Sequence, residues 1–195
     1  MRVRLIHGIH SPEGSNNMSA FAPHLAAAMP GAKVELFQYG FMGFWQARWR
    51  NDGVARQLAG LHKRQRTTEA EIWVTHSNGA AIAFLAVEEY GAMPDMIINF
   101  NPALDRNLTA LVPRVEVIHS DNDRWVNLSQ WLPFHIWGDQ GKVGYKGDFG
   151  NTINHNASKI GGKMAYDNHM GAFHPSRISA WAYFAANRID ETLGG

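Results

Sequence analysis

The sequence predicts an α/β fold, in which a mostly parallel central sheet carries helices on both faces. The prediction rests on short, apolar, β-branched segments that alternate with segments whose apolar residues recur at helical spacing. Continuously apolar strands of this kind are buried on both sides, which is typical of parallel sheets. The expected strands are 3–6, 34–37, 71–75, 96–100 and 115–119.

Helical patterns separate most of these strands. The expected helices cover 18–29, 51–66, 78–90 and 176–191. In the last of them a single apolar stripe marks an amphipathic helix. The sequence contains no internal repeat and no linker, so residues 1–195 are expected to form one domain.

Composition excludes several classes of protein. With 195 residues, 45% of them hydrophobic, the chain can bury a substantial core. A net charge of +1 without a long basic run gives no reason to expect a nucleic-acid partner. The absence of cysteine excludes disulfides and thiolate chemistry. No signal peptide or membrane span is recognised, so a cytoplasmic protein of undefined oligomeric state is expected.

The most informative segment is a buried strand, a tight turn and a buried helix around Ser77. Ser77 is flanked by His76 and Asn78, and Gly79 follows. A serine at such a corner is lifted clear of the sheet beside the N–H groups of the new helix, as in the nucleophile elbow G-x-S-x-G. Thr75 replaces the first glycine, so the match is incomplete. A serine here can also simply cap the helix.

An acid and a histidine follow this serine in the order that the elbow architecture uses. Asp123 comes directly after strand 115–119, and His169 precedes the last helix. Both therefore stand at the ends of elements, where an open parallel sheet places its functional loops. In this interpretation Ser77 is the nucleophile, His169 takes and returns its proton, and Asp123 orients the imidazole.

Alternatives remain open for the acid and for the base. Asp121 lies on the same loop as Asp123, and both can instead shape an Asx turn. His174 and His155 are alternatives to His169. The first can simply lead into the last helix, and the second lies in an irregular segment.

An acyl-transfer site also needs N–H donors for the developing oxyanion. The expected donors are the backbone N–H groups of Asn78 and Ile9, with His10 as the substitute for Ile9. The residues expected beside the substrate are Gly8, His10, His76 and Trp125. His76 is expected to pack or hydrogen-bond beside the serine rather than to act as a base.

Ten histidines raise the question of a metal site. His119, Asp121 and Asp123 alternate at a strand end, but no HExxH or other compact ligand spacing is present. The segment 121–123 lacks the glycine and the glutamate of a calcium loop. Neither a metal nor another cofactor is therefore expected.

Taken together, the chain resembles a small member of the α/β-hydrolase superfamily. The resemblance is carried by the His7-Gly8 pair and the segments 75–79, 120–126 and 168–173, which span nearly the whole chain. It implies a serine hydrolase without a cofactor, which cleaves a small-molecule carboxylic ester through an acyl-enzyme. An amidase or peptidase, a thioesterase, an acyltransferase and a non-catalytic binding module are the alternatives.

Two features depart from the superfamily pattern. Thr75 implies a looser corner or a compensating small neighbour. The superfamily usually has a helix and a further strand after the acid loop, whereas 127–166 reads as an irregular, Gly- and Trp-rich insertion or lid-like segment. Within it, 136–137 and 142–146 are expected to pair as a hairpin, and the substrate pocket cannot be carried over from the resemblance.

Overall fold

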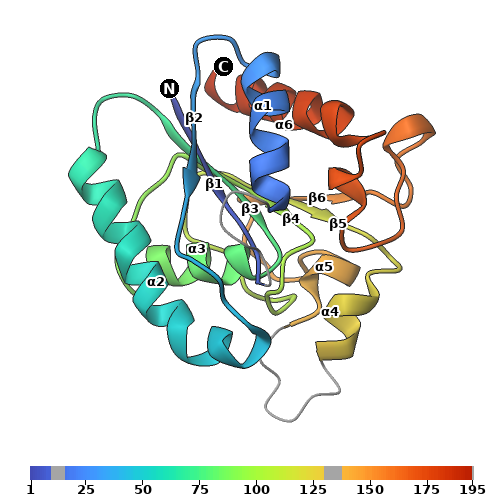
Figure 1. Ribbon diagram of the computed structural model, residues 1–195, viewed down its shortest axis with the longest axis horizontal. Coiled ribbons are helices and arrows are strands. Elements are labelled where there is room, and N and C mark those ends of the chain that lie inside the picture. The colour runs from blue at the N-terminus through green and yellow to red at the C-terminus, as the bar shows by residue number, and fades with distance from the viewer. Residues whose placement is uncertain (10–15, 130–137, 195) are drawn as a thin grey trace.

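The computed structural model describes residues 1–9, 16–129 and 138–194. In these residues six strands form one open, all-parallel sheet in the order β2-β1-β3-β4-β5-β6 (Figure 1). The strands are β1 (Arg2–Ile6), β2 (Lys33–Phe37), β3 (Glu71–His76), β4 (Met96–Phe100), β5 (Val115–His119) and β6 (Thr152–Asn156). All strands point the same way, so the loops after them gather at one edge of the sheet.

Helices cover both faces of this sheet (Figure 1). One face carries α1 (Asn17–Ala28) and α6 (Ile178–Leu193), and the other carries α2 (Phe44–Gln65) and α3 (Asn78–Glu88). Successive side chains of a strand point to opposite faces of the sheet. In β3, Val74 therefore packs in the hydrophobic core under α1 and α6, and Trp73 packs in the core under α2 and α3. The α/β fold predicted from the sequence is confirmed.

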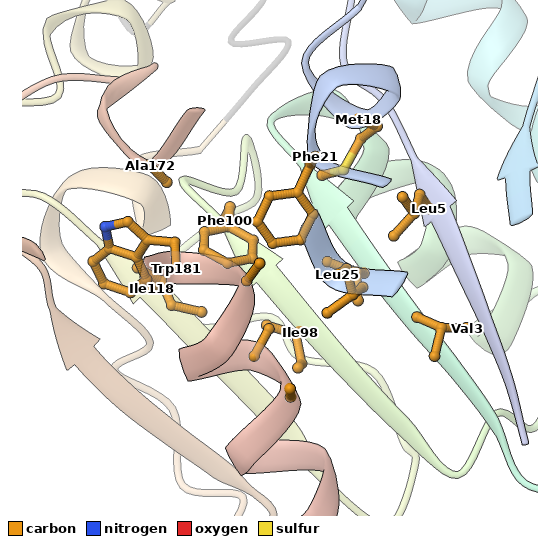
Figure 2. Packing of buried hydrophobic residues seen from close by; sticks show 14 of the residues in the cluster. Val3, Leu5, Met18, Phe21, Leu25, Ile98, Phe100, Ile118, Ala172 and Trp181 are labelled. Carbon is orange, nitrogen blue, oxygen red and sulfur yellow. The ribbon is translucent and has the colours of Figure 1, made fainter. Parts of the chain in front are cut away.

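Aromatic residues join the two helices of the first face to the sheet. Phe21 of α1 meets Phe100 of β4 edge to face at 5.6 Å, and Trp181 of α6 meets Phe100 at 5.8 Å (Figure 2). Trp181 is fully buried, and its Nε1–H donates to the carbonyl of Met164. Truncation of such a buried aromatic residue typically costs about 3–5 kcal/mol. The contacts of Trp181 therefore stabilise the packing of the C-terminal helix against the sheet.

The five predicted strands and all four predicted helices are present, but α2 begins at Phe44 rather than near Asn51. Asn51 lies inside this helix, and its side-chain amide exchanges two hydrogen bonds, of 2.9 and 2.8 Å, with that of Asn78. The helix is capped earlier, where the Gly43 N–H donates to Gln46 Oε1.

The segment 127–166 contains more regular structure than its sequence suggests. The expected hairpin is wrong, since α5 (Gln140–Val143) occupies part of its second arm, while 136–137 lies outside the described residues. The strand β6 was not predicted, because its sequence Thr-Ile-Asn-His-Asn carries no apolar run. It pairs in parallel with β5 and supplies the further strand after the acid loop. The remaining short elements are α4 (Arg124–Ser129), η1 (Gly162–Met164) and η2 (Gly171–Phe173).

Candidate active site

Ser77 occupies a sharp corner between β3 and α3. Its backbone has φ 54° and ψ −123°, a conformation that costs a non-glycine residue about 1–3 kcal/mol. The neighbouring strand holds this corner, because the Ser77 N–H donates to the carbonyl of Phe100 at 3.1 Å. The Ala103 N–H in turn donates to the Ser77 carbonyl at 3.1 Å. The backbone conformation expected of an elbow is therefore present at Ser77.

Thr75 fits this corner through a hydrogen bond to the next strand. Its side chain is fully buried, and its hydroxyl donates to Asn99 Oδ1 at 2.6 Å. Asn99 stands directly opposite Thr75 in the β3–β4 register. The hydroxyl is thus satisfied without water, and the neighbour that accommodates the extra side chain is a polar residue rather than a small one.

Two glycines allow the backbone to approach Ser77 closely. A Cβ atom on Gly8 would lie 2.9 Å from Ser77 Cβ and 3.2 Å from the carbonyl oxygen of His76. A Cβ atom on Gly79 would lie 2.5 Å from the carbonyl oxygen of Ile6. Real Cβ atoms essentially never approach another atom within 3.0 Å, so the loop after β1 and the start of α3 can come this close only where these two residues are glycines.

The loop after β1 is held by Tyr39, a residue that no motif in the sequence singles out. The Tyr39 hydroxyl donates to the carbonyls of His7, at 2.6 Å, and Gly8, at 3.1 Å, and its ring stacks on His7 at 4.0 Å. Burial raises the pKa of Tyr39, so the hydroxyl stays protonated and remains a donor. Because C=O and N–H point oppositely in a trans peptide, the Ile9 N–H is directed away from Tyr39.

The second predicted oxyanion donor is at the start of α3. Asn78 is the first residue of that helix, and helix geometry directs its backbone N–H toward the N-terminal end, where Ser77 lies. Partial positive charge accumulates at such an end and favours a developing anion. The Asn78 side chain is fully buried and turned toward Asn51 and Met42.

Asp123 and His169 meet through a short hydrogen bond. His169 Nδ1 lies 2.7 Å from Asp123 Oδ2, and the Asp123 side chain is fully buried. The other carboxylate oxygen, Oδ1, accepts the Val126 N–H at 3.2 Å. A carboxylate can only accept, so Nδ1 carries the proton of the neutral imidazole and Nε2 keeps a lone pair. This is the tautomer that a general base requires.

His76 packs against the segment that carries His169 and Phe173. Its Nε2–H donates to the carbonyl of His169 at 3.1 Å, and its ring centroid lies 4.8 Å from those of His169 and Phe173. Burial, and after it the charge of His169, lowers the pKa of His76 well below its usual range. His76 is therefore a neutral, buried donor that holds the backbone of His169, and its contact with substrate stays a prediction.

The alternatives to Asp123 and His169 lie elsewhere. Asp121 and His174 are exposed, and His155 packs against Phe184 of α6. Their polar partners are Lys159 for Asp121, Ser176 for His174 and Glu116 for His155. The structure therefore brings Asp123 and His169 together and leaves the three alternatives in other surroundings.

The remaining predicted site residues are less defined. Trp125 belongs to α4, two residues after Asp123, and 67% of its side chain is exposed. Its contact with substrate stays a prediction. His10 lies outside the described residues.

Neither a metal centre nor a membrane span is found in the described part of the chain. No three of its His, Asp or Glu side chains come together as ligands for an ion. None of its helices combines the length and the apolar character needed to cross a bilayer.

No protein-family model and no curated protein matches the sequence. Solved structures do resemble it. An extracellular alpha/beta-hydrolase from a Paenibacillus species is 10% identical, with 98% of both chains covered and a TM-score of 0.57. Carboxyl esterase 2 from Tuber melanosporum is 11% identical over 98% of this chain and 78% of its own, with a TM-score of 0.57. A cutinase-like protein from Cryptococcus is 15% identical over 96% and 94%, with a TM-score of 0.51. At such identities the likenesses establish the fold and not the reaction.

Proposed function

We propose that this chain, which has the α/β-hydrolase fold, is a serine hydrolase that works through Ser77, Asp123 and His169. The observation that carries the proposal is the 2.7 Å hydrogen bond between His169 Nδ1 and the buried Asp123 carboxylate. The His169 carbonyl accepts a hydrogen bond from the side chain of His76, the residue directly before Ser77, which supports the grouping of the three residues.

The proposed reaction follows from these positions. His169 Nε2 takes the proton of Ser77 Oγ while Oγ attacks the substrate carbonyl, and Asp123 stabilises the imidazolium that forms. The oxyanion accepts hydrogen bonds from the backbone N–H groups of Ile9 and Asn78, and one such donor is typically worth about 10²–10³ in kcat. His169 then protonates the leaving alcohol, and water hydrolyses the acyl-enzyme by the same steps in reverse.

A carboxylic ester is the substrate class that we favour. Among the structural neighbours are a carboxyl esterase and a cutinase-like protein, which supports an ester over an amide. Amide and thioester substrates would form the same acyl-enzyme, and an added alcohol would accept its acyl group in place of water. A panel of p-nitrophenyl esters, anilides and thioesters, with and without an added alcohol, separates hydrolysis of each bond from acyl transfer.

Substitution of Ser77 by alanine tests the mechanism. We expect Ser77→Ala to lower turnover of p-nitrophenyl acetate by at least about 10³-fold and to abolish labelling by a fluorophosphonate, since the variant lacks the hydroxyl that attacks. Ser179→Ala is the matched control, because Ser179 is exposed on α6 and bonded to His24, and this variant should label normally. Labelling that survives in folded Ser77→Ala would overturn the assignment. A folded wild-type protein that never labels would favour a binding module instead.

A further inference from the structure

Asn101 is a buried residue at the proposed site to which the mechanism assigns no step. It directly follows β4, its side chain is fully buried, and its backbone N–H donates to the carbonyl of Ile118 on β5 at 2.8 Å. Its φ is +45°, in the left-handed region. Apart from glycine, asparagine is among the few residues that adopt this conformation readily.

The Asn101 side chain connects a tyrosine to the proposed catalytic acid. Its Nδ2–H₂ donates to Asp123 Oδ2 at 3.1 Å, and this is the oxygen that also accepts the His169 Nδ1–H. The same Nδ2 atom lies 3.4 Å from the carbonyl oxygen of Gly141. Its Oδ1 accepts the hydroxyl of Tyr166 at 2.7 Å. The amide orientation follows from chemistry, because Asp123 can only accept and must therefore face the NH₂ group.

The hydroxyl of Tyr166 is a permanent donor in this chain of hydrogen bonds. Burial, and after it the charge of Asp123, raises the pKa of Tyr166 well above its usual range. The hydroxyl therefore stays protonated and keeps Asn101 Oδ1 turned toward itself. The NH₂ group is held on the opposite side, toward Asp123.

We propose that Asn101 and Tyr166 are positioning residues that fix the Asp123 carboxylate for His169, an inference that rests on the proposed function. A fully buried carboxylate needs donors on both oxygens. The Val126 N–H occupies Oδ1, and the amide of Asn101 shares Oδ2 with His169. Two donors from different elements prevent the carboxylate from rotating, so Oδ2 stays aimed at Nδ1.

Asn101→Gly removes the amide and keeps the left-handed backbone permitted. We expect its kcat toward p-nitrophenyl acetate to fall about 10- to 100-fold, the usual effect of losing a partner of this kind. KM should change less than about twofold, because Asn101 does not touch the substrate. A folded Asn101→Gly protein with wild-type kcat would overturn the proposal.

Asn101→Asp gives a readout that a merely structural role would not produce. The new carboxyl group is buried beside Asp123, and both effects favour its protonated form. While protonated it can donate to Oδ2 as the amide does, and once ionised it repels the acid. The ratio of its kcat/KM to that of the wild type should therefore fall tenfold or more between about pH 6 and pH 9. For Asn101→Gly the ratio should stay constant, and a constant ratio for both variants refutes the proposal.

Tyr166→Phe tests the far end of the connection. It should lower kcat about threefold to tenfold, and it should add nothing once Asn101→Gly is present, because both act through one hydrogen-bond chain. Tyr145→Phe is the matched control: its buried hydroxyl accepts the Phe149 N–H instead, so kcat should not change. Full additivity of the Tyr166 and Asn101 effects would contradict the connection.

A spectroscopic readout separates this inference from the proposed function. The His169 Nδ1–H hydrogen bond should give a downfield proton resonance in NMR whether or not the protein turns over a substrate. Loss or broadening of that resonance in Asn101→Gly supports positioning even if the wild type proves inactive. An unchanged resonance, in a wild type that labels with fluorophosphonate, overturns the inference and leaves the proposed function intact.

Discussion

Ser77 and Asn101 both have positive φ, and they stand at the ends of neighbouring strands. Ser77 would carry the reaction, and Asn101 holds the carboxylate that supports it. Unfavourable backbone conformations persist only where the surroundings fix them, and they gather at functional sites. Here the backbone hydrogen bonds between β3, β4 and β5 supply that support.

The Thr75 hydroxyl leads to a stability prediction. Thr75→Val keeps the shape of the side chain but leaves Asn99 Oδ1 buried without its donor. A buried acceptor that loses its partner costs about 1–3 kcal/mol, so the free energy of unfolding in urea should fall by that amount.

Removing the acceptor as well provides the control. In Thr75→Val/Asn99→Leu neither side chain retains a polar group from the pair, and most of the loss should be recovered. A double variant that is destabilised by the sum of both single effects would mean that the hydrogen bond does not explain why threonine is accommodated at this corner.

At the scale of elements, the site is assembled where parallel strands end. The loops after β1, β3, β4 and β5 supply Gly8, Ser77, Asn101 and Asp123 respectively. A parallel sheet brings these loops to one edge whatever their separation in the sequence. Close contact between the first two loops then depends on the absence of a side chain at Gly8.

Gly8→Ala tests that contact. The added methyl group would lie 2.9 Å from Ser77 Cβ and 3.2 Å from the His76 carbonyl oxygen, so the loop after β1 must move away. Displacement of a predicted oxyanion donor by this movement should lower kcat about 10²-fold. Gly150→Ala, where no atom lies within 4 Å of the new Cβ, should retain wild-type kcat. Unchanged kcat in Gly8→Ala would place the oxyanion donors elsewhere.

Elements with a repeating apolar pattern could be predicted from the sequence, and those held by polar contacts could not. The strand β6 is an example. Asn154 bonds by its side chain to the backbone N–H and carbonyl of Tyr145, at 2.7 and 2.9 Å. Such contacts leave no periodic signal in the sequence. The same holds for the start of α2, where the Gly43 N–H donates to the side chain of Gln46.

At the scale of the whole molecule, some residues of the proposed site could be predicted from the sequence and others could not. The order of Ser77, Asp123 and His169 along the chain, each at the end of an element, was enough to propose them together. Tyr39 and Asn101 were missed because their roles depend on contacts that arise only in the folded chain. Tyr39 reaches the loop after β1 from the loop after β2, and Asn101 reaches Asp123 from the adjacent strand.

The opposite edge of the sheet carries a buried charge cluster around Glu71, the first residue of β3. Its carboxylate accepts hydrogen bonds from Arg4 Nε at 3.0 Å and from Trp73 Nε1 at 2.8 Å, and lies 3.2 Å from His62 Nδ1. Glu71, His62 and Arg2 line a cavity of about 290 Å³ at this edge. The cluster lies away from the proposed site, so its titration should affect stability rather than catalysis.

Glu71 predicts how the free energy of unfolding depends on pH. Burial alone would raise the pKa of Glu71, but the imidazole of His62 at 3.2 Å, the hydrogen bond from Trp73 and the charge of Arg4 outweigh it and lower the pKa to about 2. A carboxyl group whose pKa is lower in the folded state than in the unfolded state stabilises the fold above its unfolded pKa of about 4.5. That contribution, on the order of 3 kcal/mol, is lost as the pH falls from about 4.5 toward 2.

Urea unfolding of the wild type and Glu71→Gln at several pH values measures this contribution. The glutamine variant should be much less stable at pH 7, because Arg4 then lacks its buried partner. The difference between the two proteins should shrink as the pH falls below about 4.5, since the wild-type Glu71 is then protonated in the unfolded state and progressively so in the folded one. Because every other acid titrates in both proteins, the difference isolates Glu71. A difference that stays constant from pH 7 to pH 3 would mean that the charge cluster does not hold Glu71 ionised.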